Sequence, residues 1–188
     1  MIVLQPLNMH WINNAKDDPS DLCAHGDVEF RMGADVLLDD SLGWDVTVSA
    51  AALYLLRTLS EPHTKQSQDG GQLFPCCGFS MYDVAGQDDV VISGCPNAVD
   101  FEVLHEASGA GVFIQSADGR KWQVPWREWR TAVYLFADAV SEFYAASSAK
   151  QVPEDDTGFS KFAAEWQRRR GRPLGGVSGP STTDSGAS

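Results

Sequence analysis

Thiol and imidazole groups are the side chains of this sequence that could most readily carry chemistry. The chain has four cysteines and four histidines, and a tetrahedral zinc site is built from such ligands. A zinc-binding or cysteine-dependent enzyme or module is therefore one possible function, with the candidate residues Cys76, Cys77, Cys95 and His105. The spacing argues against it, because the chain has no C-x-x-C pair and adjacent cysteines on an extended chain point to opposite faces. We expect reduced thiols that pack like small apolar side chains, and we assign no metal ligand and no cofactor.

Nucleophilic catalysis would need a thiol or hydroxyl beside an activating base. Cys77 could meet His63 or His105 in space, but nothing in the sequence singles out either pair. The chain has no G-x-S-x-G elbow, no G-x-x-x-x-G-K-[ST] phosphate loop and no G-x-G-x-x-G after a strand. We therefore assign no catalytic residue, and His105 is expected to be a hydrogen-bonded histidine on the inward face of its strand.

Charge is the feature that departs most from the average. The 188 residues include 14 Lys and Arg against 26 Asp and Glu, a formal net charge of −12, which is the wrong sign for a nucleic-acid or anionic-membrane binder. Residues 1–118 hold 18 acids and 4 bases, whereas residues 119–188 hold 8 acids and 10 bases. An acid-rich surface favours a basic protein partner, since opposite charge speeds encounter and fixes register. The acids predicted to bind that partner are Asp83, Asp88, Asp89, Asp100, Glu102 and Glu106.

The elements that position these residues follow from periodicity. Alternating polar and apolar residues predict a strand at 27–32 and others at 90–92, 99–106, 111–115 and 121–124. The last two flank Asp118-Gly119, a tight-turn signal, and should form a hairpin. Apolar residues at helical spacing predict a short helix at 50–59 capped by Ser49, and a long amphipathic helix from Pro125 to about Ser148. The fold class is therefore α+β, with a mainly antiparallel sheet covered on one face by the long helix and shorter helices.

The domain organisation follows from length and composition. A chain of this size fits one domain, which we place at 1–170, with a polar linker at 151–156 and a C-terminal helix at 157–170. Residues 171–188 are rich in Gly, Ser and Pro and should be a disordered tail. The stretch 60–71 is expected to be an exposed loop. The N-terminus shows no export signal and no segment is apolar enough to span a membrane, so a cytoplasmic location is expected.

Two further hypotheses rest on particular segments. The sequence runs from Val90-Val-Ile-Ser-Gly-Cys-Pro-Asn97 through Trp122-Gln-Val-Pro-Trp126 into a helix ending Phe143-Tyr144. With its size and acidity, this body resembles small bacterial α+β proteins found beside polymorphic toxins as immunity proteins. The resemblance implies a non-catalytic inhibitor that binds and blocks a basic toxin domain. The alternative is a structural or regulatory interaction domain that uses an aromatic face around Trp126, although Trp129 at helical spacing favours a role in covering the core.

Overall fold

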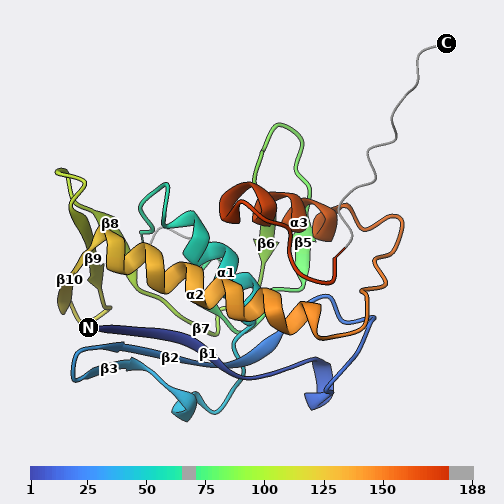
Figure 1. Ribbon diagram of the computed structural model, residues 1–188, viewed down its shortest axis with the longest axis horizontal. Helices are drawn as coiled ribbons and strands as arrows, with labels where there is room; N and C mark the ends of the chain where they lie inside the picture. Colours follow the sequence, from blue (N-terminus) through green and yellow to red (C-terminus); the bar gives the residue numbers. More distant parts are fainter. Residues whose placement is uncertain (65–70, 178–188) are drawn as a thin grey trace.

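The computed structural model describes residues 1–64 and 71–177, and it confirms the α+β fold class (Figure 1). The α-helices of this part are α1 (Val48–Arg57), α2 (Trp126–Ala145) and α3 (Thr157–Arg170). Short 3-10 turns lie at Ile12–Asn14 and Asp40–Leu42. The strands are β1 (Ile2–His10), β2 (His25–Met32), β3 (Asp35–Leu38), β4 (Phe74–Pro75), β5 (Ser80–Tyr82), β6 (Val91–Ser93), β7 (Ala98–Val99), β8 (Glu102–His105), β9 (Gly111–Gln115) and β10 (Lys121–Pro125).

The largest sheet is the antiparallel β1-β2-β3 sheet at the N-terminal end of the chain. Strand β2 was predicted, but β1, its nine-residue neighbour, was not. Pro6 argued against a strand in the sequence, because proline has no backbone N–H to donate within a sheet. Proline is tolerated here because β1 is an edge strand. The β1–β2 register sets Leu4 opposite Phe30, and both side chains are buried in the core.

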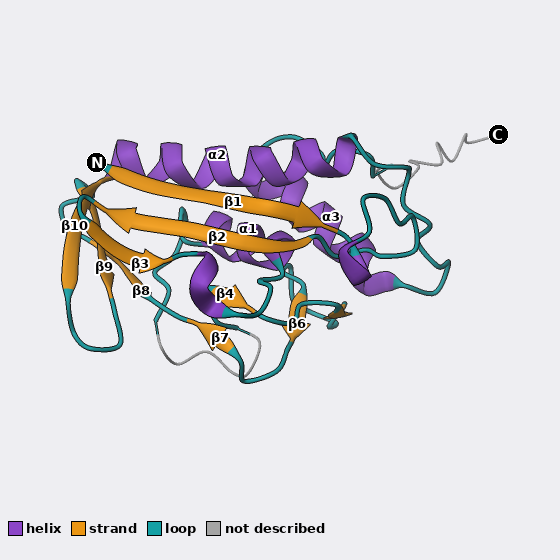
Figure 2. Cartoon of the chain, turned by 90° about the horizontal axis from the view of Figure 1, so that it is seen from below, coloured by secondary structure: helices purple, strands orange, loops and turns teal. Residues whose placement is uncertain are grey.

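Helices α1 and α2 pack on one face of this sheet. α2 follows β1 along its length, and α1 lies beside α2 behind β2 (Figures 1 and 2). α1 is buried from Val48 to Leu56, which its small alanines allow. It begins one residue before the predicted cap Ser49, with Thr47 at the cap position. Trp129 of α2 is fully buried and its indole lies against Phe30, with ring centroids 6.4 Å apart.

The remaining strands form small antiparallel sheets, so the sheet structure is divided instead of continuous. The predicted hairpin is confirmed as β9 and β10, with Gly119 of its turn at φ 84°, a conformation that glycine adopts without strain. β8 pairs with the other side of β9. Two short pairs, β4–β7 and β5–β6, complete the structure beside α3 and α1.

The packed chain continues beyond the boundary predicted after residue 170. α3 ends at Gly171, which has φ 78°, a common helix C-terminus. Leu174 is then buried in the core, and the amide of Gly175 donates to Ser141 Oγ of α2 at 2.9 Å. The rest of the predicted tail, 178–188, lies outside the described residues, as does the 65–70 part of the predicted loop.

Candidate functional site

Three of the predicted partner-binding acids lie in the connection between β5 and β6, beside α3. Asp83 pairs with Lys161 of α3 at 3.0 Å, and Asp89 pairs with Arg169 at 2.6 Å. Partial burial opposes the charge of Asp89, but the charge and hydrogen bond of Arg169, together with the charges of Arg57 and Arg168, outweigh burial and lower the pKa of this carboxyl. Asp88 is exposed. Two of these three acids are therefore already paired with basic side chains of α3.

The other three predicted acids lie in β8 or directly beside β7 and β8, and they are half-buried. Asp100 Oδ1 lies 2.7 Å from His63 Nε2. Glu102 accepts a hydrogen bond from Gln115 at 2.9 Å, and Glu106 accepts one from Gln123 at 2.7 Å. These acids stay a prediction for partner binding, although each of the three already bonds to a neighbouring side chain.

A buried ion-pair network connects α3 to the rest of the fold. Glu165 of α3 is fully buried and accepts hydrogen bonds from Arg57, from Arg169 and from the amide of Val90. Burial opposes the charge of Arg57, but its hydrogen bonds to Glu165 and the charge of that carboxylate outweigh burial and raise the pKa of Arg57. A carboxylate removed from water needs such partners. The network ties α1, α3 and β6 together.

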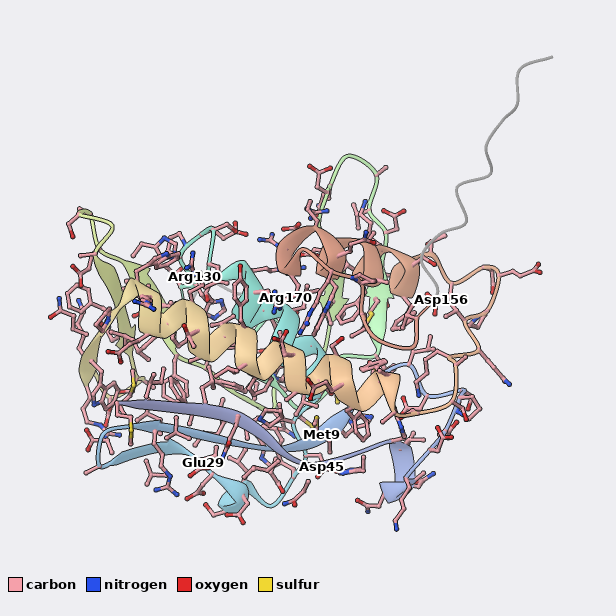
Figure 3. All side chains as sticks on the ribbon, in the orientation of Figure 1. Met9, Glu29, Asp45, Arg130, Asp156 and Arg170 are labelled. Atoms are coloured by element: carbon pink, nitrogen blue, oxygen red, sulfur yellow. The ribbon has the colours of Figure 1, made fainter. Side chains whose placement is uncertain are left out.

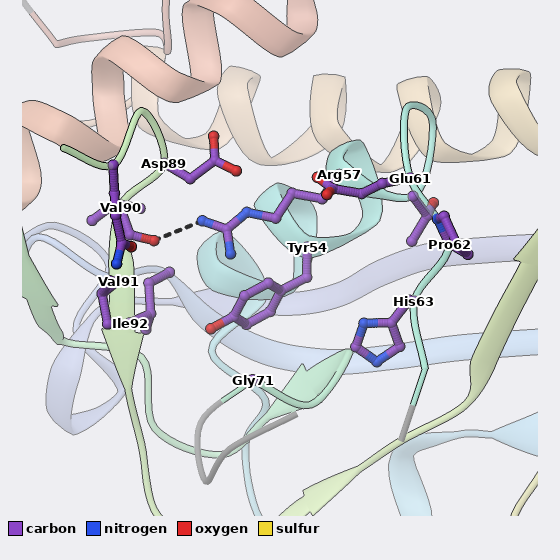
Figure 4. A pocket seen from close by; sticks show the side chains of 12 residues that line it. Tyr54, Arg57, Glu61, Pro62, His63, Gly71, Asp89, Val90, Val91 and Ile92 are labelled. Carbon is purple, nitrogen blue, oxygen red and sulfur yellow. Dashed lines mark hydrogen bonds between the residues drawn. The ribbon is translucent and has the colours of Figure 1, made fainter. Parts of the chain in front are cut away.

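A surface pocket of about 410 Å³ opens beside this network (Figure 4). Tyr54, Arg57, His63 and Asp89 are among its lining residues. The guanidinium of Arg57 also donates to the carbonyl of Val90 at 2.7 Å, the interaction drawn in Figure 4. Nε and Nη2 of Arg57 are thus bonded to acceptors of the protein itself.

The pocket has a base but not the other parts of a hydrolytic site. His63, oriented by Asp100, could accept a proton. The described residues that line the pocket include neither a serine nor a cysteine, and the hydroxyl of Thr58 donates to the carbonyl of Leu55 at 2.6 Å. Burial raises the pKa of Tyr54 to about 12, so this phenol stays protonated at neutral pH. The geometry therefore assembles no activated nucleophile among these residues.

The structure brings together three of the four residues of the thiol alternative. The sulfur atoms of Cys76, Cys77 and Cys95 lie within 4.8 Å of one another. The expectation that the adjacent pair points to opposite faces is wrong, because the chain bends at Cys76 and the two sulfurs are 3.7 Å apart. His105 lies elsewhere, with Nε2 2.8 Å from the carbonyl of Thr58. The predicted hydrogen bond is present, but the ring is half-buried and not part of the core.

An acidic surface that the sequence reasoning did not single out lies on the outer face of the β1-β2-β3 sheet. Within the described chain both α1 and α2 lie behind this sheet or beyond its β1 edge, and the opposite face is open (Figure 2). The residues of β2 that alternate with its buried ones are Asp27, Glu29 and Arg31. Glu29 and Asp45 lie on the side away from α2 (Figure 3).

The rim of this face is also acidic. Asp40 and Asp45 are exposed, and Asp39 is half-buried. We call this set the acidic sheet face: Asp27, Glu29, Asp39, Asp40 and Asp45. Asp35 is not part of it, because it lies opposite buried Met32 and accepts a hydrogen bond from Trp122 Nε1 at 2.8 Å. The signal was present in the sequence, since residues 17–56 hold nine acids and a single base, Arg31. β1 was not predicted from the sequence, and without β1 the open face of the sheet could not be defined.

Comparison of the chain with protein-family models, with curated proteins and with solved structures finds no match. In residues 1–64 and 71–177, none of the helices combines the length and the apolar character that crossing a membrane requires. The functional argument therefore rests on the geometry of the sites.

Proposed function

We propose that this protein is a non-catalytic acidic domain that binds a basic protein partner, in the manner of an immunity protein that blocks a toxin. The observation that carries the proposal is the acidic sheet face, an open face of the sheet with five acids and one arginine. A cytoplasmic place of action and the toxin as partner belong to the same proposal.

The acidic sheet face offers both parts of a protein-binding surface. Its acids supply the field that attracts a cationic partner and fixes its orientation. Apolar side chains lie among them, because Val3 and Leu7 alternate with the buried residues of β1 and Val36 of β3 is 41% exposed. β3 is also an edge strand.

Two carboxylates of this face have lowered pKa values, which favours their charged form. Hydrogen bonds from Arg31 and Gln5 lower the pKa of Glu29, and hydrogen bonds from the side chain and amide of Ser41 lower the pKa of Asp39. Glu29 is also paired, with Arg31 of its own strand, and Asp45 lies 3.3 Å from His10. Among the described residues, Asp27, Asp39 and Asp40 form no ion pair, whereas Asp83 and Asp89 are paired with cations of α3. These three carboxylates of the acidic sheet face are therefore available to a partner.

The test uses the basic proteins encoded next to this gene, each expressed with a tag and titrated against the untagged protein by calorimetry. A sheet variant carries D27N, E29Q and D40N. A control variant carries the same charge change at exposed acids outside the face, E128Q, E142Q and E154Q. A third variant, D88N with E102Q and E106Q, examines the acids predicted from the sequence.

One neighbouring product should bind below micromolar Kd, and the sheet variant should weaken binding roughly tenfold or more, because desolvated charges at the contact are lost. The control variant should bind within about twofold of the unaltered protein, since distant charges are screened. If none of the basic neighbours binds at micromolar concentration, the proposed function is wrong. If only the third variant weakens binding, the proposed function is retained, but the partner-binding surface lies at β8 and the β5–β6 connection instead of the acidic sheet face.

A further inference from the structure

The three clustered sulfurs come from two segments that the fold joins. Cys76 and Cys77 directly follow β4, and Cys95 lies just before β7. β4 and β7 pair in antiparallel fashion, with Pro75 opposite Ala98, so the end of one strand lies beside the start of the other. The amide of Cys76 continues the ladder by donating to the carbonyl of Asn97 at 3.1 Å.

The cysteine-bearing backbone is anchored to α1. Thr47 donates its hydroxyl to the carbonyl of Cys76 at 2.9 Å, and its amide donates to the carbonyl of Pro75 at 2.8 Å. Gly78 packs so tightly that a Cβ there would lie 2.7 Å from the Cβ of Ala50. The sulfurs are therefore presented by a fixed part of the fold, and a preformed ligand set loses little entropy on binding.

The spacing of the sulfurs matches a metal site. Two cysteines joined by a disulfide would have their sulfurs ~2.05 Å apart, whereas the sulfurs of Cys76 and Cys77 are 3.7 Å apart. A Zn–S bond of ~2.3 Å sets neighbouring sulfurs of a tetrahedron ~3.8 Å apart. The third sulfur, of Cys95, is within 4.8 Å of both, so a small side-chain rotation would complete the set.

We propose that Cys76, Cys77 and Cys95 together bind one thiophilic d¹⁰ metal ion, Zn(II) or Cu(I), through their three sulfurs. Soft thiolate ligands select these ions over hard cations. Iron–sulfur clusters are held by four cysteines, and the described residues gather three. Binding forms three metal–sulfur bonds and releases the thiol protons to solvent, without any change of oxidation state.

The surroundings suit a thiol cluster that exchanges protons for a metal. All three cysteines are half-buried, and their sulfurs lie within 4.8 Å of one another. A cation at the centre would relieve this crowding by compensating the three negative charges.

The experiment uses the full-length protein with its tag removed, reduced with a phosphine and freed of metal by a chelator. It is titrated with Zn(II) against a chromophoric competitor, with Cu(I) against a Cu(I)-specific chelator, and with Co(II) as a spectroscopic stand-in for Zn(II). Variants C76S, C77S and C95S remove one ligand each. C23A removes the buried thiol that donates to the carbonyl of Gly78 and serves as the matched control.

The unaltered protein and C23A should each bind one equivalent and show sulfur-to-cobalt charge transfer in Co(II). Each serine variant should lose roughly a hundredfold or more in affinity and lose that band, while its thermal unfolding without metal shows that it is folded. Retention of Zn(II) identifies a zinc site, and retention of Cu(I) alone a copper site. Less than half an equivalent of either ion, or full binding by C95S, would overturn the proposal. Air oxidation to a disulfide that neither ion prevents would count against it as well.

Discussion

Arg57 of α1 holds both carboxylate oxygens of Glu165 of α3, with Nε 2.8 Å from Oε1 and Nη2 2.8 Å from Oε2. The two residues are far apart in sequence, and the Glu165 side chain is 0% exposed. This two-pronged pair joins the C-terminal helix to the centre of the fold.

Removing the buried carboxylate should destabilise the protein strongly. E165A would leave Arg57 and Arg169 without their shared partner, and breaking a buried pair in this way costs about 3 to 5 kcal/mol. K161A, which removes a more exposed pair with Asp83 on the same helix, should cost less than about 1 kcal/mol. Urea unfolding at pH 7 measures both, and equal effects would contradict the structural role of Glu165.

The pairs of the C-terminal segment should also make the fold sensitive to acid. Burial opposes the charge of Asp138, but hydrogen bonds from Arg170 and Arg172 outweigh it and lower its pKa. A lowered folded-state pKa means that this stability is present above the unfolded value of ~3.9 and is lost as the pH falls through the folded value. D138N should therefore lose less stability than the unaltered protein between about pH 5 and pH 3. Parallel pH profiles of the urea midpoint would contradict this.

Substitution of Trp129 tests whether the aromatic residues of α2 cover the core or form an interaction surface. Its ring is fully buried and its Nε1 donates to Thr58 Oγ1 at 3.0 Å, so W129A should destabilise the fold by about 3 to 5 kcal/mol. W126A, at a half-buried ring on the edge of the same helix, should cost less. Urea unfolding gives the stability, and sedimentation gives the oligomeric state. A folded W129A that has lost oligomers would instead favour the interaction domain.

The sequence predicted the elements whose signals are local. The hairpin at Asp118-Gly119 and the helix with Trp126 and Trp129 on one stripe were predicted correctly, because turn chemistry and periodicity act over a few residues. β1 was missed, since Pro6 and Asn8 interrupt its pattern and its stability comes from long-range contacts with β2 and α2.

The candidate sites depended on long-range pairing that no local pattern encodes. β4 and β7 are two residues each, too short to be recognised, and their pairing is what brings Cys95 to Cys76. The ion pair of Asp89 with Arg169 likewise joins distant segments. Charge counting therefore located the acid-rich region but could not show which acids the protein's own cations occupy.

Gly158 tests how closely α3 packs on the β5–β6 pair. A Cβ at this position would overlap the carbonyl oxygen of Met81 in β5. Alanine normally stabilises a helix by about 1 kcal/mol relative to glycine, but overpacking against a backbone atom costs about 1 to 3 kcal/mol, so G158A should be destabilising overall. The opposite change at an exposed position of α3, A164G, should show the usual loss of about 1 kcal/mol. Both follow from urea unfolding, and a G158A protein more stable than the unaltered one would show that α3 does not lie against β5 as described.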